Sequence, residues 1–227
     1  MNEVLKQGSH EDKVFEGRTV FDFDGSIEEV SVFQGCKFEG AGHFNGSYAA
    51  FCPAERRPFA MFRECTFTNA DKAALMQWAW FEDCIFTDCE DGIFDKGQMR
   101  LHIERCQFYG MGTSTPAYHP DCIQTGGGLD CKYMMVKNNT FDIPGGNSWC
   151  FIETAFGPVS DVRIIGNRGG KSGGPTYDIY LWDDKFGAPK RCWVDHNEWD
   201  DHAARVPVAY NFAGGEAMIG ERNRRAT

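Results

Sequence analysis

Hydrophobic and polar residues alternate along this chain with a period of two, and the alternation recurs in a short repeat. Seven segments align without gaps on one anchor position, which is occupied by Cys36, Cys65, Cys84, Cys106, Asn139, Asn167 and Asn197. The residue three positions before the anchor is apolar in every copy, and the residue two positions after it is aromatic in every copy except at Gly169. Such alternation is typical of β-strands that are buried on one face.

The spacing between anchors predicts a solenoid of stacked coils. Consecutive anchors lie 29, 19, 22, 33, 28 and 30 residues apart, which is shorter than a propeller blade of about 40 residues. The intervening segments hold turn-forming Gly, Asn, Asp, Ser and Pro and no helical pattern. A leucine-rich repeat would need a constant length, and a jelly roll would show hairpin turns. We therefore predict an all-β fold, a single-stranded parallel β-helix of about seven or more coils.

The extent of the repeat divides the chain into three segments. Residues 1–17 lack the repeat and are predicted to form an N-terminal cap or tether, and residues 18–204 are predicted to form the β-helix. Residues 205–227 are predicted to supply a C-terminal cap strand and a tail. The cap strand VPVAY is expected to close the last coil, because an uncovered solenoid end leaves apolar residues in water.

The anchor column has a structural interpretation. Cysteine behaves as a small hydrophobic residue in a core, so the first four anchors predict a column of reduced thiols. Asparagine hydrogen-bonds to neighbouring main chain and tolerates left-handed backbone, so the last three anchors predict an amide ladder at a corner of the coil. Two of the other cysteines, Cys122 and Cys150, are placed on equivalent strands of adjacent coils, where they would form a disulfide if oxidised.

The chain is expected to hold no metal and no cofactor. Its ten cysteines include no CxxC pair of the kind that binds zinc. The acidic segment DHNEWDDH offers Asp195, Asp200, Asp201 and His202 to a cation, but a solvated acidic loop is the stronger interpretation.

Composition narrows the choice of partners. The chain carries 23 basic and 33 acidic residues, a net charge of −10, which disfavours nucleic acids and anionic membranes. A polyanionic substrate would then need a local basic patch. The first residues contain no apolar core of a signal peptide, and no apolar run reaches the length of a membrane span. We therefore expect synthesis in the cytoplasm.

Five segments carry a resemblance to a known superfamily: YHPDCIQTGGG (118–128), VKNNTFD (136–142), VSDVRIIGNRGG (159–170), TYDIYL (176–181) and CWVDHNEWDD (192–201). They resemble the right-handed parallel β-helix superfamily of pectate-lyase-like proteins, including small β-helix proteins and β-helix domains of phage particles. The resemblance implies right-handed coils and a bias towards carbohydrate, without fixing a reaction.

Two signatures of that superfamily are missing. Pectate lyases place a catalytic Arg or Lys beside calcium-binding aspartates, and no comparable cluster is found in this sequence. The Asp-Pro-His motif of alginate epimerases is also absent, since His119 precedes Pro120 and Asp121.

A candidate site follows from the second strand of successive coils between residues 118 and 184. The predicted catalytic residues are His119, Asp121, Glu153 and Asp183, and the predicted substrate-binding residues are Tyr118, Gln124, Trp149, Tyr180 and Trp182. Asp121 with Glu153 or Asp183 would supply the acid and base of glycoside hydrolysis. In a lyase, His119 or Tyr180 would instead abstract a proton. The alternative is that these residues only shape turns and side-chain ladders.

The outward column four residues before the anchor is unusually apolar. Its members are Val32, Met61, Trp80, His102, Met135, Arg163 and Trp193. Contiguous exposed apolar surface often marks an interface. The column therefore predicts self-association, for example as a trimer, or contacts with other virion proteins.

Two functions from different classes fit these observations. We favour a structural or binding module of a phage-like particle, a tail or head-decoration protein that resides in the virion and binds a cell-surface glycan. The alternative is an extracellular polysaccharide depolymerase, either a hydrolase or a lyase, that works in the groove between residues 119 and 184.

Overall fold

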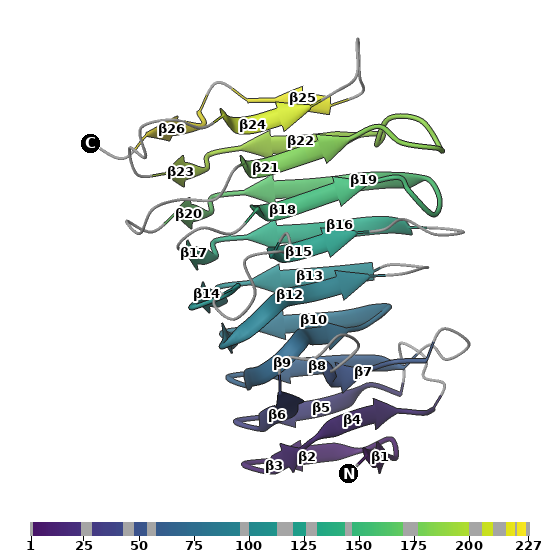
Figure 1. Cartoon of the computed structure of the whole chain (residues 1–227). Coiled ribbons are helices and arrows are strands. Elements are labelled where there is room, and N and C mark those ends of the chain that lie inside the picture. Colours follow the sequence, from purple (N-terminus) through teal and green to yellow (C-terminus); the bar gives the residue numbers. More distant parts are fainter. Residues whose placement is uncertain are drawn as a thin grey trace.

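The computed structural model is a stack of β-coils with the two chain ends at opposite ends of the stack (Figure 1). The structure describes residues 2–23, 29–42, 48–53, 58–95, 100–112, 120–125, 131–143, 147–169, 177–199, 206–210, 217–220 and 222–225. No helix among these residues is long and apolar enough to cross a membrane.

Each coil contributes one strand to a nine-stranded sheet, whose neighbours all pair in parallel. Its strands are β2 (Ser9–Glu11), β5 (Ser31–Gln34), β8 (Phe59–Arg63), β10 (Trp78–Glu82), β13 (Arg100–Glu104), β16 (Cys131–Lys137), β19 (Val159–Ile165), β22 (Cys192–Asp195) and β25 (Ala217–Ile219). These strands end just before the anchor column.

A 17-stranded sheet supplies the other two sides of the coils. The strands directly after the anchor are β3 (Val14–Glu16), β6 (Lys37–Gly42), β9 (Thr66–Leu75), β11 (Ile85–Thr87), β14 (Gln107–Tyr109), β17 (Thr140–Asp142), β20 (Arg168–Gly169), β23 (Glu198–Trp199) and β26 (Arg224–Arg225). The third side holds β1 (Asn2–Leu5), β4 (Arg18–Phe21), β7 (Tyr48–Phe51), β12 (Cys89–Asp95), β15 (Asp121–Thr125), β18 (Ser148–Glu153), β21 (Tyr177–Trp182) and β24 (Val206–Tyr210), together with the end of β9.

The predicted all-β, parallel β-helix is confirmed. The coiled pairing also runs beyond the predicted bounds of the β-helix at both ends. At the N-terminus, β2 pairs with β5 and β3 pairs with β6, so residues 2–16 form a coil of their own. At the C-terminus, β24, the VPVAY strand, pairs with β21.

Two columns of stacked phenylalanines fill the core. In the column two residues after the anchor, successive ring centroids lie 4.6–5.0 Å apart from Phe15 to Phe141. In the column three residues before the anchor, Phe33, Phe62 and Phe81 stack at 5.1 and 4.9 Å. Because parallel strands are spaced by about 4.8 Å, residues in register place their rings at stacking distance. The rings of the two columns meet edge to face, the geometry that aromatic pairs prefer.

The gap in the aromatic column at Gly169 has a physical reason. Gly169 pairs with Phe141, but the ring that stacks on Phe141 at 5.2 Å belongs to Trp149, which is 1% exposed. A Cβ atom at position 169 would lie 2.1 Å from Cζ2 of Trp149. A tryptophan from the neighbouring side of the coil therefore occupies the space of the missing ring.

The anchor column forms the two predicted ladders. The thiol of Cys84 donates to the carbonyl of Phe62 in the preceding coil, and the thiol of Cys106 donates to that of Phe81. Further along the stack, Asn167 Nδ2 donates to Val136 O at 3.0 Å and to Asn197 Oδ1 at 2.9 Å. The ladder continues to Asn223, one coil beyond the repeat that the sequence reveals. These anchors thus satisfy main-chain groups that the turn would otherwise leave buried without a partner.

The residue before each anchor turns the chain at the corner of the coil. It has a positive φ in all seven copies, at Gly35, Glu64, Asp83, Arg105, Asn138, Gly166 and His196. Its amide can donate to the next coil, as Asp83 N does to Glu104 O at 3.1 Å and Arg105 N does to Lys137 O at 3.1 Å. This link offsets the cost of left-handed backbone at non-glycine residues.

All ten cysteines are free and buried. The register pairs Cys150 with Ile123, so Cys122 is offset from Cys150 by one residue. A one-residue offset directs two strand side chains to opposite faces. Cys122 and Cys150 thus lie on paired strands of adjacent coils, as predicted, but the offset does not place their thiols on a common face. Burial raises the pKa of both thiols, which makes them poor nucleophiles.

The Trp149–Gly169 contact yields a test of the core. Gly169→Ala is expected to destabilise the protein by about 1–3 kcal/mol, because the new methyl group overlaps the indole. Trp149→Ala is expected to cost about 3–5 kcal/mol through the cavity that it leaves. In the double variant the methyl group added at position 169 enters that cavity, so the combined loss of unfolding free energy in urea should be smaller than the sum. Strict additivity would contradict the proposed packing.

Candidate functional site

The sequence-predicted site is only partly within the described chain. Tyr118 and His119 lie outside the described residues, as do Asp200, Asp201 and His202 of the acidic segment. The remaining member of that segment, Asp195, is buried and forms an ion pair with Arg222. Among the residues that the structure describes, no three His, Cys, Asp or Glu side chains gather as a metal site would require.

Asp121 lies in the interior of the coil. It is 1% exposed, and its Oδ1 accepts hydrogen bonds from Ser148 Oγ at 2.5 Å and Asn147 Nδ2 at 3.0 Å. Its amide donates to Asp91, whose other carboxylate oxygen pairs with Lys72. Burial raises the pKa of Asp121 well above its usual range. Because the carboxyl group is enclosed, a sugar cannot reach it, and its predicted role in hydrolysis is not supported by the geometry.

Trp149 is likewise unavailable to a sugar, since its ring belongs to the aromatic core stack. The packing therefore does not support the predicted role of Trp149 in substrate binding. Burial of Trp149 could not be predicted from its own strand, because the space that its ring fills lies beside Gly169 in the next coil.

Other predicted site residues do come together on β15, β18 and β21. Gln124 Nε2 donates to Glu153 Oε1 at 3.2 Å, and Glu153 is in register with Trp182. Tyr180 meets Trp182 edge to face at 5.1 Å. Asp183 follows directly after β21. Burial raises the pKa of Glu153, but the acid that was predicted to work with it, Asp121, is enclosed in the core.

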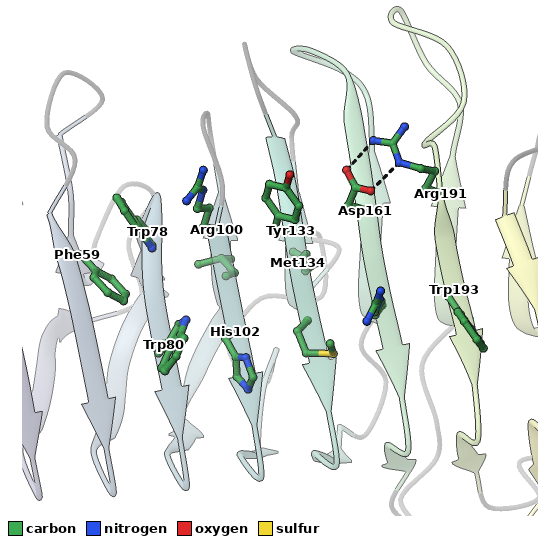
Figure 2. A pocket seen from close by; sticks show the side chains of 13 residues that line it. Phe59, Trp78, Trp80, Arg100, His102, Tyr133, Met134, Asp161, Arg191 and Trp193 are labelled. Carbon is green, nitrogen blue, oxygen red and sulfur yellow. Dashed lines mark hydrogen bonds and ion pairs between the residues drawn. The ribbon is translucent and has the colours of Figure 1, made fainter. Parts of the chain in front are cut away.

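A groove of about 1120 Å³ lies elsewhere, on the outer face of the nine-stranded sheet (Figure 2). It crosses β8, β10, β13, β16, β19 and β22, so successive coils each contribute side chains to it. Apart from Leu101 and Met134, the lining residues form two rows, six and four residues before the anchor. The first row holds Phe59, Trp78, Arg100, Tyr133, Asp161 and Arg191, and the second holds Trp80, His102, Met135, Arg163 and Trp193.

The first row begins as a stack of flat groups. Phe59 and Trp78 stack at 4.7 Å. The guanidinium of Arg100 then lies between two rings, 5.2 Å from the centre of Trp78 and 5.5 Å from that of Tyr133. Cation–π contacts of this kind fix an arginine side chain without neutralising it. Arg100 forms no ion pair with any described residue, so its charge is available to a ligand.

The second row is part of the apolar outward column that stands four residues before the anchor. Its residues are in register across the sheet, with Trp80 opposite His102, His102 opposite Met135 and Arg163 opposite Trp193. Trp80 and Trp193 are 42% and 40% exposed, so their ring faces are accessible. The expectation that this column is a protein interface stays a prediction.

The backbone at one end of the groove is strained. Tyr133, Asp161 and Arg191 occupy the same place in three successive coils and have φ values of 66°, 59° and 50°. Left-handed backbone is uncommon at non-glycine residues, and the amide of Asp161 donates to Lys190 O at 3.0 Å in the next coil. Here it turns three side chains of the first row, including a tyrosine that is 59% exposed, onto the outer surface.

The groove is locally basic on an acidic protein. Arg100, Arg163 and Arg191 face a single lining carboxylate, Asp161. Arg191 holds Asp161 through two hydrogen bonds of 2.6 Å, which lower the pKa of Asp161 to about 2. Arg163, like Arg100, makes no ion pair with a described residue. The groove therefore presents, among aromatic rings, two guanidinium groups that pair with no carboxylate of the described residues.

The sequence contains a signal for this groove that the predictions above did not use. The residues six before the anchors, from Phe59 to Arg191, stand one strand period away from the outward column. Considered together, the two positions place aromatic and basic side chains on one outer face of successive coils. The predicted site was instead placed at the carboxylates on or beside β15, β18 and β21.

Comparisons with known proteins inform the fold. Neither a protein-family model nor a curated protein matches the chain. Among solved structures, the crystal structure of an alginate lyase from Paenibacillus sp. str. FPU-7 matches with a TM-score of 0.55 and 16% sequence identity. The match covers 99% of this chain and 88% of that one. At this identity the similarity establishes a common β-helix architecture.

Burial of Asp121 makes a prediction about pH. A carboxyl group whose pKa is raised by folding holds its proton more tightly in the folded state. Its contribution to stability is therefore largest below the unfolded pKa of about 3.9 and is lost as the pH rises towards the folded value. In urea unfolding, Asp121→Asn should gain stability relative to the wild type as the pH is raised from about 4 to neutrality. A pH-independent difference would contradict this assignment.

Proposed function

We propose that the protein binds an acidic polysaccharide along the groove on the nine-stranded sheet and cleaves it by β-elimination. The observation that carries this proposal is the pair of uncompensated arginines, Arg100 and Arg163, set among exposed aromatic rings. A polyuronate chain has the matching chemistry, because each sugar carries a carboxylate on a ring with apolar faces. Guanidinium groups bind carboxylates with defined geometry.

The shape of the groove supports a chain-like ligand. Each coil adds one side chain to each row, and the coils repeat at the strand spacing of about 4.8 Å. A polymer that lies across the strands would therefore meet Trp78, Arg100 and Tyr133 in turn. The high net charge of −10 would repel such a polyanion elsewhere, which favours its placement at this basic patch.

The composition of the lining favours elimination over hydrolysis. Glycoside hydrolysis uses two carboxyl groups, one of which must be protonated. Asp161 is the one carboxylate among the described lining residues, and its pKa of about 2 keeps it ionised. Elimination instead needs a cation beside the uronate carboxylate and a base for the adjacent proton. The groove offers arginines for the first role and His102 and Tyr133 for the second.

The comparison agrees with this proposal at the level of architecture, since the matching structure is that of an alginate lyase. The module of a phage-like particle that the sequence favoured has no support from the comparisons. Binding of a glycan without cleavage is the alternative for the same groove, and assays of binding and of cleavage together separate the two.

The proposal predicts activity on polyuronates. Incubation with alginate or polygalacturonate should yield new reducing ends together with the ultraviolet absorbance of an unsaturated uronate, whereas a neutral glucan should remain intact. Arg100→Ala should weaken binding of a uronate oligosaccharide about tenfold, equivalent to about 1.4 kcal/mol. Isothermal titration calorimetry measures this affinity.

Arg18→Ala is the matched control, because Arg18 also stacks on aromatic rings, Phe51 and Tyr48, but lies outside the groove. It should retain wild-type affinity. Binding without new chain ends would remove the cleavage step and leave the binding site. Absence of both binding and cleavage, from folded protein, would overturn the proposal.

A further inference from the structure

His102, which lines the groove, forms a hydrogen-bonded pair with Glu104. They lie two residues apart on β13, so their side chains project from the same face of the strand. His102 Nε2 lies 2.9 Å from Glu104 Oε2. His102 also lies against Trp80, with ring centroids 5.3 Å apart, which limits rotation of the imidazole.

Glu104 is held as a carboxylate by cations from its own and the neighbouring coil. Its Oε1 accepts a hydrogen bond from Lys137 Nζ at 3.0 Å and lies 3.3 Å from a guanidinium nitrogen of Arg105. The hydrogen bond from His102 and that from Lys137 lower the pKa of Glu104. An ionised carboxylate can only accept, so the hydrogen on the imidazole must reside on Nε2.

This arrangement selects one tautomer of the imidazole. With Nε2 committed to Glu104, Nδ1 carries the free lone pair and has no hydrogen-bond partner among the described residues. A histidine oriented in this way by a carboxylate is prepared to accept a proton.

Arg100 completes the arrangement. It is two residues before His102 on the same strand, so the two side chains leave the same face about 7 Å apart at their Cα atoms. In a uronate, the acidic hydrogen sits on the ring carbon that bears the carboxylate. A cation for the carboxylate and a base for the hydrogen are therefore both needed at one sugar, and Arg100 and His102 supply these two groups from neighbouring outward positions of one strand.

We propose that His102, positioned by Glu104, is the base that removes this proton while Arg100 binds the carboxylate. This inference rests on the proposed function. Nδ1 takes the proton from the carbon next to the carboxylate. The electron pair of that C–H bond forms a carbon–carbon double bond, and the bond from the adjacent carbon to the glycosidic oxygen breaks. Water protonates the departing oxygen, and His102 later returns its proton to solvent. No oxidant, metal or cofactor enters the balance.

The experiment separates chemistry from binding. His102→Ala should lower kcat by about 10²–10⁴-fold, the usual contribution of a general base, while the affinity for an unsaturated oligosaccharide product stays at the wild-type value. Glu104→Leu should lower kcat with KM unchanged. Glu104→Gln should be milder, because its amide oxygen still accepts from Nε2.

A readout without substrate tests the positioning role. Nitrogen NMR of the His102 imidazole, assigned by its loss in His102→Ala, should report hydrogen on Nε2 in the wild type. In Glu104→Leu it should report a mixture of tautomers. His196→Asn is the matched control, since it removes another histidine that pairs with a carboxylate, Asp195, outside the groove. Its kcat should equal that of the wild type.

The possible failures are distinguishable. Wild-type kcat in His102→Ala would overturn the assignment of the base and leave the proposed lyase function intact. Hydrogen on Nδ1 in the wild type would overturn the positioning role of Glu104. A wild-type protein that eliminates no polyuronate would overturn the proposed function, and the assignment of His102 with it.

Discussion

The structure depends on one numerical match, between the spacing of parallel strands and the stacking distance of aromatic rings. Residues in register on neighbouring coils place their rings at the strand spacing of about 4.8 Å, and the observed centroids of the main column lie 4.6–5.0 Å apart. Each coil packs its apolar side chains against one another and against those of the next coil. The core is therefore built one coil at a time, and the length of the loops between strands is free to vary.

The same register makes the outer surface regular. A ring held in the core fixes the position of the residues one and three places before it on the same strand. On the nine-stranded sheet, Phe81 is locked between Phe62 and Phe86, and the outward residues Trp80 and Trp78 are thereby held in rows with their neighbours. The strand register that stacks the rings in the core therefore also aligns the side chains that line the groove. No loop is needed to hold these rows in place.

The sequence predicted the columns of the core, but it did not reveal which residues of the predicted site are buried, and the reason is physical. Period two tells which residues share a face, and the anchors of the repeat give the register, so the Asn139 and Asn167 ladder and the aromatic stack follow from the sequence. Burial of Asp121 does not follow, because its partners Ser148 and Asn147 come from another coil. Burial of Trp149 likewise depends on Gly169 of the next coil. The left-handed residues Tyr133 and Asp161 carry no sequence mark that distinguishes them from ordinary strand residues.

The two rows of the groove have a consequence for how such a protein changes over evolutionary time. Since one coil supplies one residue to each row, duplication or loss of a coil would lengthen or shorten the groove by a whole step while preserving the stack within. A single substitution in a row would alter the groove only at that coil. The number of coils would then set the length of the groove, and the outward side chains would separately set its selectivity.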